Sequence, residues 1–245
     1  MSALYESDKL LAEYLLFHFG TPDEILPPDR AWPAAMRDAL GFPQRTVARF
    51  SPGTVARGLD LGCAVGRSTF EMARTCEHVT GLDFSHAFIR AAEALRQGDT
   101  LTYDRLEEAT LRTRLSARRP EGIDAARLRL VQGDAMHLPG EFGAFDRVHA
   151  ANLLCRLPEP QRLLIRLPEL VKPGGELVLA TPCTWLTEFT PLENWPSAGT
   201  FEWLKASLEA DFSLIRQTEE PFLIRETARK FQWSSSLVTV WRRTD

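Results

Sequence analysis

Residues 55–67 read Val-Ala-Arg-Gly-Leu-Asp-Leu-Gly-Cys-Ala-Val-Gly-Arg, and this stretch decides the fold. Its first half is an apolar run containing Asp60 near its end, which is typical of a buried strand. Gly62 and Gly66 then enclose a turn of small residues, and a helical pattern follows over residues 68–74. A strand, a glycine turn and a helix present free backbone N–H groups and a helix N-terminus to a ligand. The stretch therefore predicts a nucleotide-like ligand at this turn.

Composition narrows the class of protein. The chain has 245 residues, of which 44% are hydrophobic and 25% charged, as in a soluble single domain with a sizeable core. A formal net charge of −4 gives no electrostatic case for binding nucleic acid. Residues 1–9 are polar, unlike a signal peptide, and no apolar run approaches the roughly 20 residues of a membrane span. We expect a cytoplasmic protein without nucleic-acid or membrane partners.

Cysteine and histidine spacing favours neither a disulfide framework nor a metal site. The four cysteines are scattered and include no Cys-x-x-Cys pair. The five histidines show no paired spacing of the kind that metal ligands have. We therefore predict reduced thiols and no bound metal.

Strand-like and helical patterns alternate along the chain, which indicates a mostly parallel sheet with helices on both faces. After the glycine turn we expect strands at residues 78–83, 128–132, 145–150, 176–181, 212–217 and 235–242. Expected helices cover residues 5–19, 30–40, 43–50, 87–97, 160–171 and 200–210, with a kink or new turn at Pro168. The short link between the last two strands indicates antiparallel pairing at the sheet edge.

The predicted fold is thus α/β, with a single domain over residues 1–245 and a seven-stranded sheet that carries an antiparallel C-terminal edge strand. An N-terminal helical cap occupies residues 1–50, and it either covers the ligand cleft or only the sheet edge. The core spans residues 55–245 and contains an insertion at about residues 98–127. The insertion alternates like a hairpin, and a helix over residues 105–114 is the alternative.

An acidic residue follows the second strand. Asp83 lies about twenty residues beyond the glycine turn, where a carboxylate can accept both hydrogen bonds of a ribose diol. The turn itself reads Gly-x-x-x-Gly rather than Gly-x-Gly-x-x-Gly. This spacing disfavours a nicotinamide-dependent oxidoreductase.

Four motifs in series resemble the class I S-adenosylmethionine-dependent methyltransferases and span about half of the chain. They are Asp60-Leu-Gly-Cys-Ala-Val-Gly66, Asp83, Gly133-Asp134-Ala135 and Lys172-Pro-Gly-Gly175. One position departs from the family pattern, since the middle glycine common in the turn is Ala64 here. The resemblance implies a Rossmann-like fold and S-adenosylmethionine as the cofactor.

The same resemblance implies a set of cofactor-binding residues. Gly62 and Gly66 would let the backbone approach the methionine part closely. Asp134 would accept from the adenine amine, or serve only as a turn residue; Phe84 would pack on the adenine, or be structural. Arg67 would pair with the cofactor carboxylate, or be a surface charge. The full set is Asp60, Gly62, Cys63, Ala64, Gly66, Arg67, Asp83, Phe84, Asp134, Ala135 and Ala151.

A narrower resemblance comes from segments outside these motifs. The chain is similar to the 5-thiohistidine (4-mercaptohistidine) N-methyltransferases of ovothiol biosynthesis, and this similarity extends over nearly its full length. The similar segments are Glu13-Tyr-Leu-Leu-Phe-His-Phe-Gly20, Ala151-Asn-Leu-Leu-Cys-Arg-Leu-Pro158, Thr184-Trp-Leu-Thr-Glu-Phe-Thr-Pro191 and Pro221-Phe-Leu-Ile-Arg-Glu-Thr-Ala-Arg-Lys-Phe-Gln-Trp233. In many members this domain is fused behind an iron-dependent sulfoxide synthase. Here we expect a stand-alone domain, with a separate synthase as its pathway partner and an amino acid as its substrate.

Candidate acceptor-side residues follow the fourth strand and the first helix. Asn152 lies beyond the carboxyl end of a strand, where open α/β sheets bind ligands, and its amide would orient the imidazole or the amino group. Arg156 would hold a carboxylate by two parallel bonds, or be an ordinary helix-surface residue. Tyr14 and His18 are four residues apart and share a helix face, which lines the pocket or lies at the surface. With Asn152 they are the candidate catalytic residues, and His18 would be a base or only a satisfied buried histidine.

Further acceptor-side candidates come from loops and the last hairpin. Trp185, Phe189 and Trp195 would enclose a flat imidazole, or simply anchor their loop. Arg225 and Lys230 are candidates only through the narrower resemblance. Two other functions stay open at this point: a methyltransferase for another small metabolite at nitrogen or oxygen, and a non-catalytic S-adenosylmethionine-binding protein.

Overall fold

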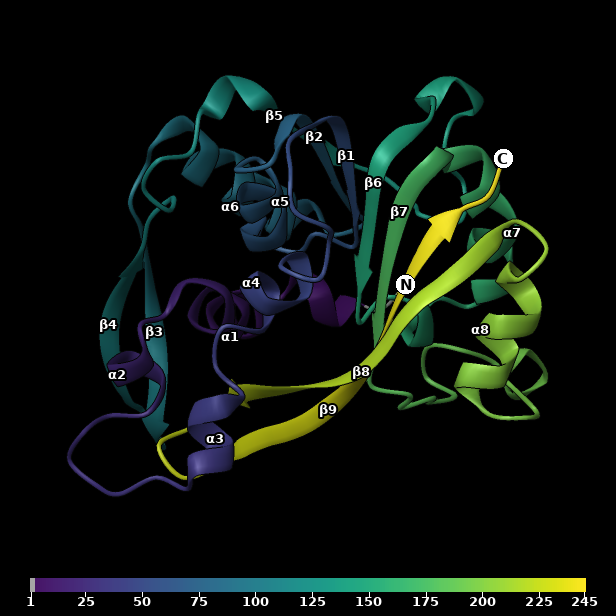
Figure 1. Ribbon diagram of the computed structural model, residues 1–245. Coiled ribbons are helices and arrows are strands. Elements are labelled where there is room, and N and C mark those ends of the chain that lie inside the picture. Colours follow the sequence, from purple (N-terminus) through teal and green to yellow (C-terminus); the bar gives the residue numbers. More distant parts are fainter. Residues whose placement is uncertain (1–2) are drawn as a thin grey trace.

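A seven-stranded sheet organises the computed structural model, which describes residues 3–245 (Figure 1). The strand order is β5-β2-β1-β6-β7-β9-β8, in which β9 pairs antiparallel with β7 and β8 and the other neighbours are parallel. This arrangement confirms the predicted fold class. The strands are β1 (Val55–Leu61), β2 (Cys76–Asp83), β5 (Leu128–Gln132), β6 (Phe145–Ala151), β7 (Val171–Thr181), β8 (Phe212–Arg225) and β9 (Phe231–Arg243).

The two C-terminal strands are longer than the sequence patterns predict. The C-terminal strand was expected at the edge of the sheet, but it is not the edge strand. The last strand, β9, lies inside the sheet, and β8 forms the edge. Residues 236–241 of β9 are all buried, as expected for an interior strand, whereas residues 213–217 of β8 are exposed. Pro221 interrupts the strand pattern in the sequence, but an edge strand tolerates it, and it pairs with Ser235.

Helices cover both faces of the sheet, as predicted (Figure 1). On one face, α4 (Phe42–Val47), α5 (Arg67–Met72) and α6 (His86–Gln97) contribute to one apolar core. On the other, α7 (Pro160–Leu170) and α8 (Thr200–Leu208) pack into a second core. Pro168 lies inside α7, which continues for two residues beyond it.

The N-terminal helices are η1 (Ala3–Glu6), α1 (Asp8–Phe19), α2 (Pro22–Ile25) and α3 (Ala34–Asp38), the last shorter than expected. Ser7 is the N-cap of helix α1, and its side chain accepts a hydrogen bond from the N–H of Leu10. It packs between the insertion and β8, as Figure 1 shows. The insertion is an antiparallel hairpin of β3 (Leu101–Glu108) and β4 (Leu111–Ala117), so the helical alternative for this segment is wrong.

Short 3-10 turns complete the chain: η2 (Ala125–Arg127), η3 (Gly140–Phe142), η4 (Leu154–Arg156) and η5 (Leu192–Asn194). Among residues 3–245, no helix is both long enough and apolar enough to cross a bilayer.

Candidate functional site

A cavity of about 560 Å³ lies where four parallel strands end, the place at which open α/β sheets bind ligands. Its floor comes from the ends of β1, β2, β5 and β6, and its other walls come from α1, the loop after β7 and the β8–β9 hairpin. Twelve of the residues predicted from the sequence line it: Tyr14, His18, Asp60, Gly62, Ala64, Asp83, Phe84, Ala135, Ala151, Asn152, Arg156 and Phe189.

The glycine turn runs through three left-handed residues. Gly62, Ala64 and Gly66 have φ of 71°, 48° and 91°. A left-handed conformation costs a residue with a Cβ roughly 1–2 kcal/mol, so Ala64 is a strained replacement for the usual glycine. The backbone N–H of Ala64 donates to Asp83 Oδ2 at 2.8 Å. Asp83 thus holds the turn in place, and the N–H groups of Gly62, Cys63 and Gly66 are also bonded within the protein, to the carbonyls of Leu82 and Cys63.

Asp83 is the most perturbed acid at the cavity. Its Oδ1 accepts from the N–H of Ser85 at 2.9 Å, and its Oδ2 accepts from Ala64. Burial raises the pKa of Asp83 to about 6, although both backbone hydrogen bonds favour the ionised form. Each carboxylate oxygen keeps a second lone pair for a hydroxyl group in the cavity.

The raised pKa predicts that cofactor binding depends on pH. A ribose diol donates to the ionised carboxylate, so below pH 6 the free protein must first release the proton on Asp83. We expect a constant dissociation constant for S-adenosylmethionine above about pH 7 and an increase approaching tenfold per pH unit below 6. Titration calorimetry from pH 5 to 8 measures this, with proton release detected in buffers of different ionisation enthalpy. A profile that is flat to pH 5 would contradict it.

Asp60 is occupied inside the protein. It is 1% exposed, its Oδ2 accepts from the Thr69 hydroxyl at 2.7 Å, and its Oδ1 lies 2.8 Å from His149 Nδ1. His149 Nε2 lies in turn 3.1 Å from the hydroxyl of Thr46. This buried chain ties β1 to β6, α4 and α5, so Asp60 supports the glycine turn.

Two neutral rings form the wall contributed by α1. Tyr14 and His18 stack with 5.8 Å between ring centroids, and Tyr14 lies 4.8 Å from Phe88. Burial, with a smaller contribution from Arg67, lowers the pKa of His18 to about 3. Burial also raises the pKa of Tyr14, so the phenol stays protonated. The wall therefore offers flat, uncharged surfaces and no cationic imidazole at neutral pH.

Two polar residues from the segment after β6 line the opposite side. Asn152 has φ of 56°, a left-handed conformation that asparagine adopts more readily than most residues. Arg156 donates from Nη1 to the carbonyl of Thr184 at 2.9 Å, and its guanidinium lies 4.8 Å from the centre of the Phe189 ring. Arg156 is held in place by these contacts and still reaches the cavity.

Several predicted residues are not among those that line the cavity. Arg67 pairs with Glu71 and donates to the carbonyl of His18. Asp134 accepts from the N–H of Met136 and lies 2.9 Å from His137 Nδ1, as a turn residue would. The predicted residues that do not line the cavity are Cys63, Gly66, Arg67, Asp134, Trp185, Arg225 and Lys230.

Trp185 anchors its loop, which is the alternative that the sequence left open. Its indole N–H donates to the hydroxyl of Thr200 at 2.9 Å, and its ring packs edge-on against Trp203. The ring therefore packs against the apolar core beside α8. Of the three aromatic candidates in this loop, Phe189 alone lines the cavity.

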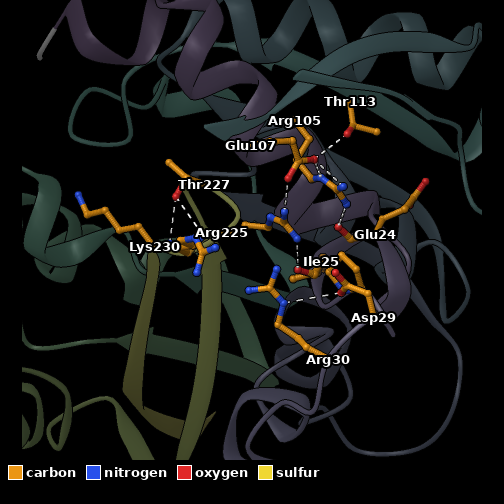
Figure 2. A network of polar contacts seen from close by, with 12 residues as sticks. Glu24, Ile25, Asp29, Arg30, Arg105, Glu107, Thr113, Arg225, Thr227 and Lys230 are labelled. Atoms are coloured by element: carbon orange, nitrogen blue, oxygen red, sulfur yellow. Dashed lines mark hydrogen bonds and ion pairs between the residues drawn. The ribbon is translucent and has the colours of Figure 1, made fainter. Parts of the chain in front are cut away.

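Arg225, predicted as a substrate contact, is not among the residues that line the cavity and belongs to a different polar network (Figure 2). Arg225 is 4% exposed, donates to the carbonyl of Ile25 at 2.9 Å and pairs with Glu107 at 2.6 Å. The greater length of β8 carries it to the insertion hairpin, away from the cavity. Lys230 extends from the hairpin tip and pairs with Glu226 at 2.6 Å, so it is not a cavity residue either.

The cavity wall formed by the β8–β9 hairpin was not predicted from the sequence. Phe222, Ile224, Gln232 and Ser234 line the cavity from β8 and β9, and Glu13 does so from α1. The narrower resemblance pointed to residues 221–233 as a block. Which of them face inward depends on the register of the hairpin, and only alternate residues of a strand share a face.

No group of three or more histidine, cysteine or acidic side chains within residues 3–245 is placed to hold a metal ion. All four cysteines are free thiols.

Comparison with known proteins gives the class. Residues 59–179 match the family model described as a methyltransferase domain. The chain is 30% identical over 122 residues to methyltransferase GfsG of Streptomyces halstedii, covering 50% of this chain and 36% of that protein. It is also 30% identical over 149 residues to trans-aconitate 2-methyltransferase of Deinococcus radiodurans, covering 60% and 46%. The aligned parts thus span less than half the length of these two relatives.

A solved structure shares the fold. The N-methyltransferase NodS of Bradyrhizobium japonicum WM9, in complex with S-adenosyl-L-homocysteine, superposes with a TM-score of 0.57 at 15% identity. The superposition covers 96% of this chain and 99% of NodS. The sheet order, the glycine turn and the family match together define a class of protein that binds S-adenosylmethionine. Residues 59–179 thus form the core of a class I S-adenosylmethionine-dependent methyltransferase domain.

The residues of the cavity fit that cofactor. Asp83 has the lone pairs that a ribose diol needs, and Phe84 is a 41% exposed ring beside it. Side chains at two glycine positions would crowd the cavity floor: a Cβ on Gly62 would lie 3.0 Å from Leu153, and one on Gly133 would lie 3.0 Å from Leu82. Asp83, the glycine turn and Ala135 would hold the adenosyl and methionine parts.

Proposed function

We propose that this chain transfers a methyl group from S-adenosylmethionine to an imidazole ring nitrogen of 5-thiohistidine, which yields ovothiol. One observation carries the proposal: flat, neutral aromatic rings line the same cavity as an amide and a guanidinium. Tyr14 and His18 form the rings, and Asn152 and Arg156 supply the polar groups. An aromatic amino acid presents a flat ring at one end and a carboxylate at the other, which matches this pairing. The similarity of residues 13–20, 151–158, 184–191 and 221–233 to the ovothiol enzymes supports the same acceptor.

S-adenosylmethionine supplies an activated methyl group when bound. The bound cofactor would supply both the methyl group and a neutral thioether leaving group, and the acceptor's ring nitrogen would supply the lone pair. A nitrogen with a free lone pair needs no base, which is consistent with a His18 whose pKa is about 3 and which therefore does not hold a proton near neutral pH. The protein's contribution is alignment of donor and acceptor, which can supply about 7–11 kcal/mol.

Arg156 would hold the acceptor's carboxylate, and Arg225 would not contact the acceptor. We expect Arg156→Ala to raise the acceptor KM about tenfold to a hundredfold, because a charge-assisted hydrogen bond contributes about 1.5–3 kcal/mol, while cofactor affinity stays unchanged. Arg225→Ala removes the bonds to Ile25 and Glu107, so it should lower the melting temperature and leave the KM of the folded enzyme unchanged. Steady-state kinetics with each substrate varied, beside thermal unfolding, separates the two effects. The reverse pattern would refute this assignment.

The deciding experiment incubates the protein with S-adenosylmethionine and 5-thiohistidine, with histidine and a simple thiol as controls. Mass spectrometry and NMR then locate the added methyl group. Methyl on a ring nitrogen of 5-thiohistidine is the expected result. Methyl on sulfur, or no transfer to 5-thiohistidine, would refute the acceptor while leaving the class unchanged. An iron-dependent sulfoxide synthase on a separate chain is the pathway partner that this proposal implies, and the chain is expected to act in the cytoplasm.

A further inference from the structure

The side-chain amide of Asn152 is fixed in one orientation by a residue from the last strand. The hydroxyl of Ser236 donates to Asn152 Oδ1 at 2.7 Å, and Ser236 is 0% exposed. The backbone of Asn152 is held as well, because its N–H donates to the carbonyl of Ala180 at 2.8 Å. Asn152 lines the cavity with a left-handed backbone. Both ends of the residue are thus restrained by the neighbouring strands β7 and β9.

This orientation leaves the two Nδ2–H groups as the part of the amide that is free to bind a ligand. Within residues 3–245, Asn152 Nδ2 donates to no protein group. The Oδ1 atom, by contrast, already has the Ser236 hydroxyl as a partner. Asn152 therefore presents donors to a ligand. These donors suit an acceptor molecule in which an electron-rich atom that does not react lies beside the atom that receives the methyl group.

The proposed reaction has a selectivity problem that such a donor solves. The sulfur of 5-thiohistidine is a better nucleophile than its ring nitrogen, yet the methyl group must go to nitrogen. A hydrogen bond from an uncharged N–H to a thiolate ties up electron density on sulfur and fixes its position. His18 and Tyr14 are neutral, so no cationic ring in that wall attracts the sulfur there instead.

We propose that Asn152 binds the sulfur of the acceptor through Nδ2, and that Ser236 is the positioning residue that keeps those N–H groups turned toward it. This inference rests on the proposed function for the identity of the acceptor. It assigns a specificity role to a serine that no motif in the sequence marks. Sulfur is retained in a fixed place as a thiolate, and the ring nitrogen is the only nucleophile left facing the methyl group.

The chain offers a matched control one position away. Ser235 lies on the same strand, but its hydroxyl donates to Glu219 at 2.7 Å on the other side of β9. Ser235→Ala therefore removes a hydroxyl and a hydrogen bond of the same length without touching Asn152. Asn152→Asp keeps the acceptor for the Ser236 hydroxyl and replaces the N–H donors by a carboxylate oxygen.

The experiment measures where the methyl group goes. Wild-type protein and the Ser236→Ala, Asn152→Asp and Ser235→Ala variants are incubated with S-adenosylmethionine and 5-thiohistidine, and NMR gives the ratio of S-methyl to N-methyl product. We expect Ser236→Ala to raise the S-methyl share at least tenfold and Asn152→Asp to lower kcat/KM for the acceptor about a hundredfold. Ser235→Ala should match wild type. An unchanged product ratio in Ser236→Ala together with an unchanged kcat/KM in Asn152→Asp would overturn the inference.

A binding measurement separates failure of this inference from failure of the proposed function. Calorimetry in the presence of S-adenosylhomocysteine compares 5-thiohistidine with its S-methyl thioether, which has no thiolate. Wild type should prefer the thiolate at least tenfold, and Ser236→Ala should lose most of that preference. If wild type shows this preference but does not methylate nitrogen, the proposed reaction falls and the sulfur contact stands. If wild type binds both compounds equally, or neither, the sulfur contact is refuted.

Discussion

We expect Asp83→Asn to raise the dissociation constant for S-adenosylmethionine about a hundredfold. In the wild-type protein each carboxylate oxygen accepts one backbone N–H, from Ala64 or Ser85, and keeps a lone pair for a ribose hydroxyl. Hydrogen bonds to a charged group contribute about 1.5–3 kcal/mol each, and the neutral amide loses that charge and one acceptor. A loss of about 3 kcal/mol corresponds to roughly two decades in affinity. Titration calorimetry at pH 8, where Asp83 is ionised, measures the change.

Glu6→Gln is the matched control for this substitution. Glu6 is also an acid that accepts two backbone N–H groups, from His86 and Ala87, but it is not among the residues that line the cavity. Its loss of charge next to α6 should leave cofactor affinity within about threefold of wild type, since a single exposed charge contributes little. Similar dissociation constants for Asp83→Asn and wild type would remove Asp83 from the cofactor site.

We expect His149→Leu to lower the free energy of unfolding by about 3–5 kcal/mol. His149 and Asp60 are 0% and 1% exposed and lie 2.8 Å apart between Nδ1 and Oδ1. Without the imidazole, the Asp60 carboxylate keeps only the Thr69 hydroxyl, and removing one partner of a buried pair leaves the other uncompensated. Urea unfolding followed by circular dichroism at pH 7 measures the difference.

Asp60→Asn tests the same pair from the other side and keeps the experiment interpretable if His149→Leu does not fold. The amide is the same size and can still accept from the imidazole, while no buried charge is left behind. We expect a cost of about 1–2 kcal/mol, well below that of His149→Leu. If both substitutions cost less than about 1 kcal/mol, the buried chain does not support the glycine turn.

The cofactor half of the site was predictable because its residues depend on local chain order. The glycine turn, Asp83 and Ala135 each follow a strand directly, and parallel strands bring their carboxyl ends to one edge of the sheet. Asp134 is an exception to this rule. It has the right position in the sequence, yet its carboxylate is used by Met136 and His137 in its own turn.

The acceptor half was only partly predictable. Asn152 and Arg156 follow β6 closely, and they were placed correctly at the cavity. Arg225 was not, because its position depends on how far β8 extends and on what lies beside it. Its partner Glu107 is 118 residues away in the chain, and no local pattern reports such a contact.

The sequence by itself determined the class of protein, its fold and its cofactor, because short motifs at strand ends encode them and strand periodicity encodes the sheet. Only the tertiary structure decided which other side chains line the cavity. In the long β8–β9 pairing, Ser234 lines the cavity, Ser236 contacts Asn152, and Ser235 points away from both. These three serines are indistinguishable in the sequence. Their roles differ because successive residues of a strand point to opposite faces, and the pairing that sets the faces joins residues distant in the chain.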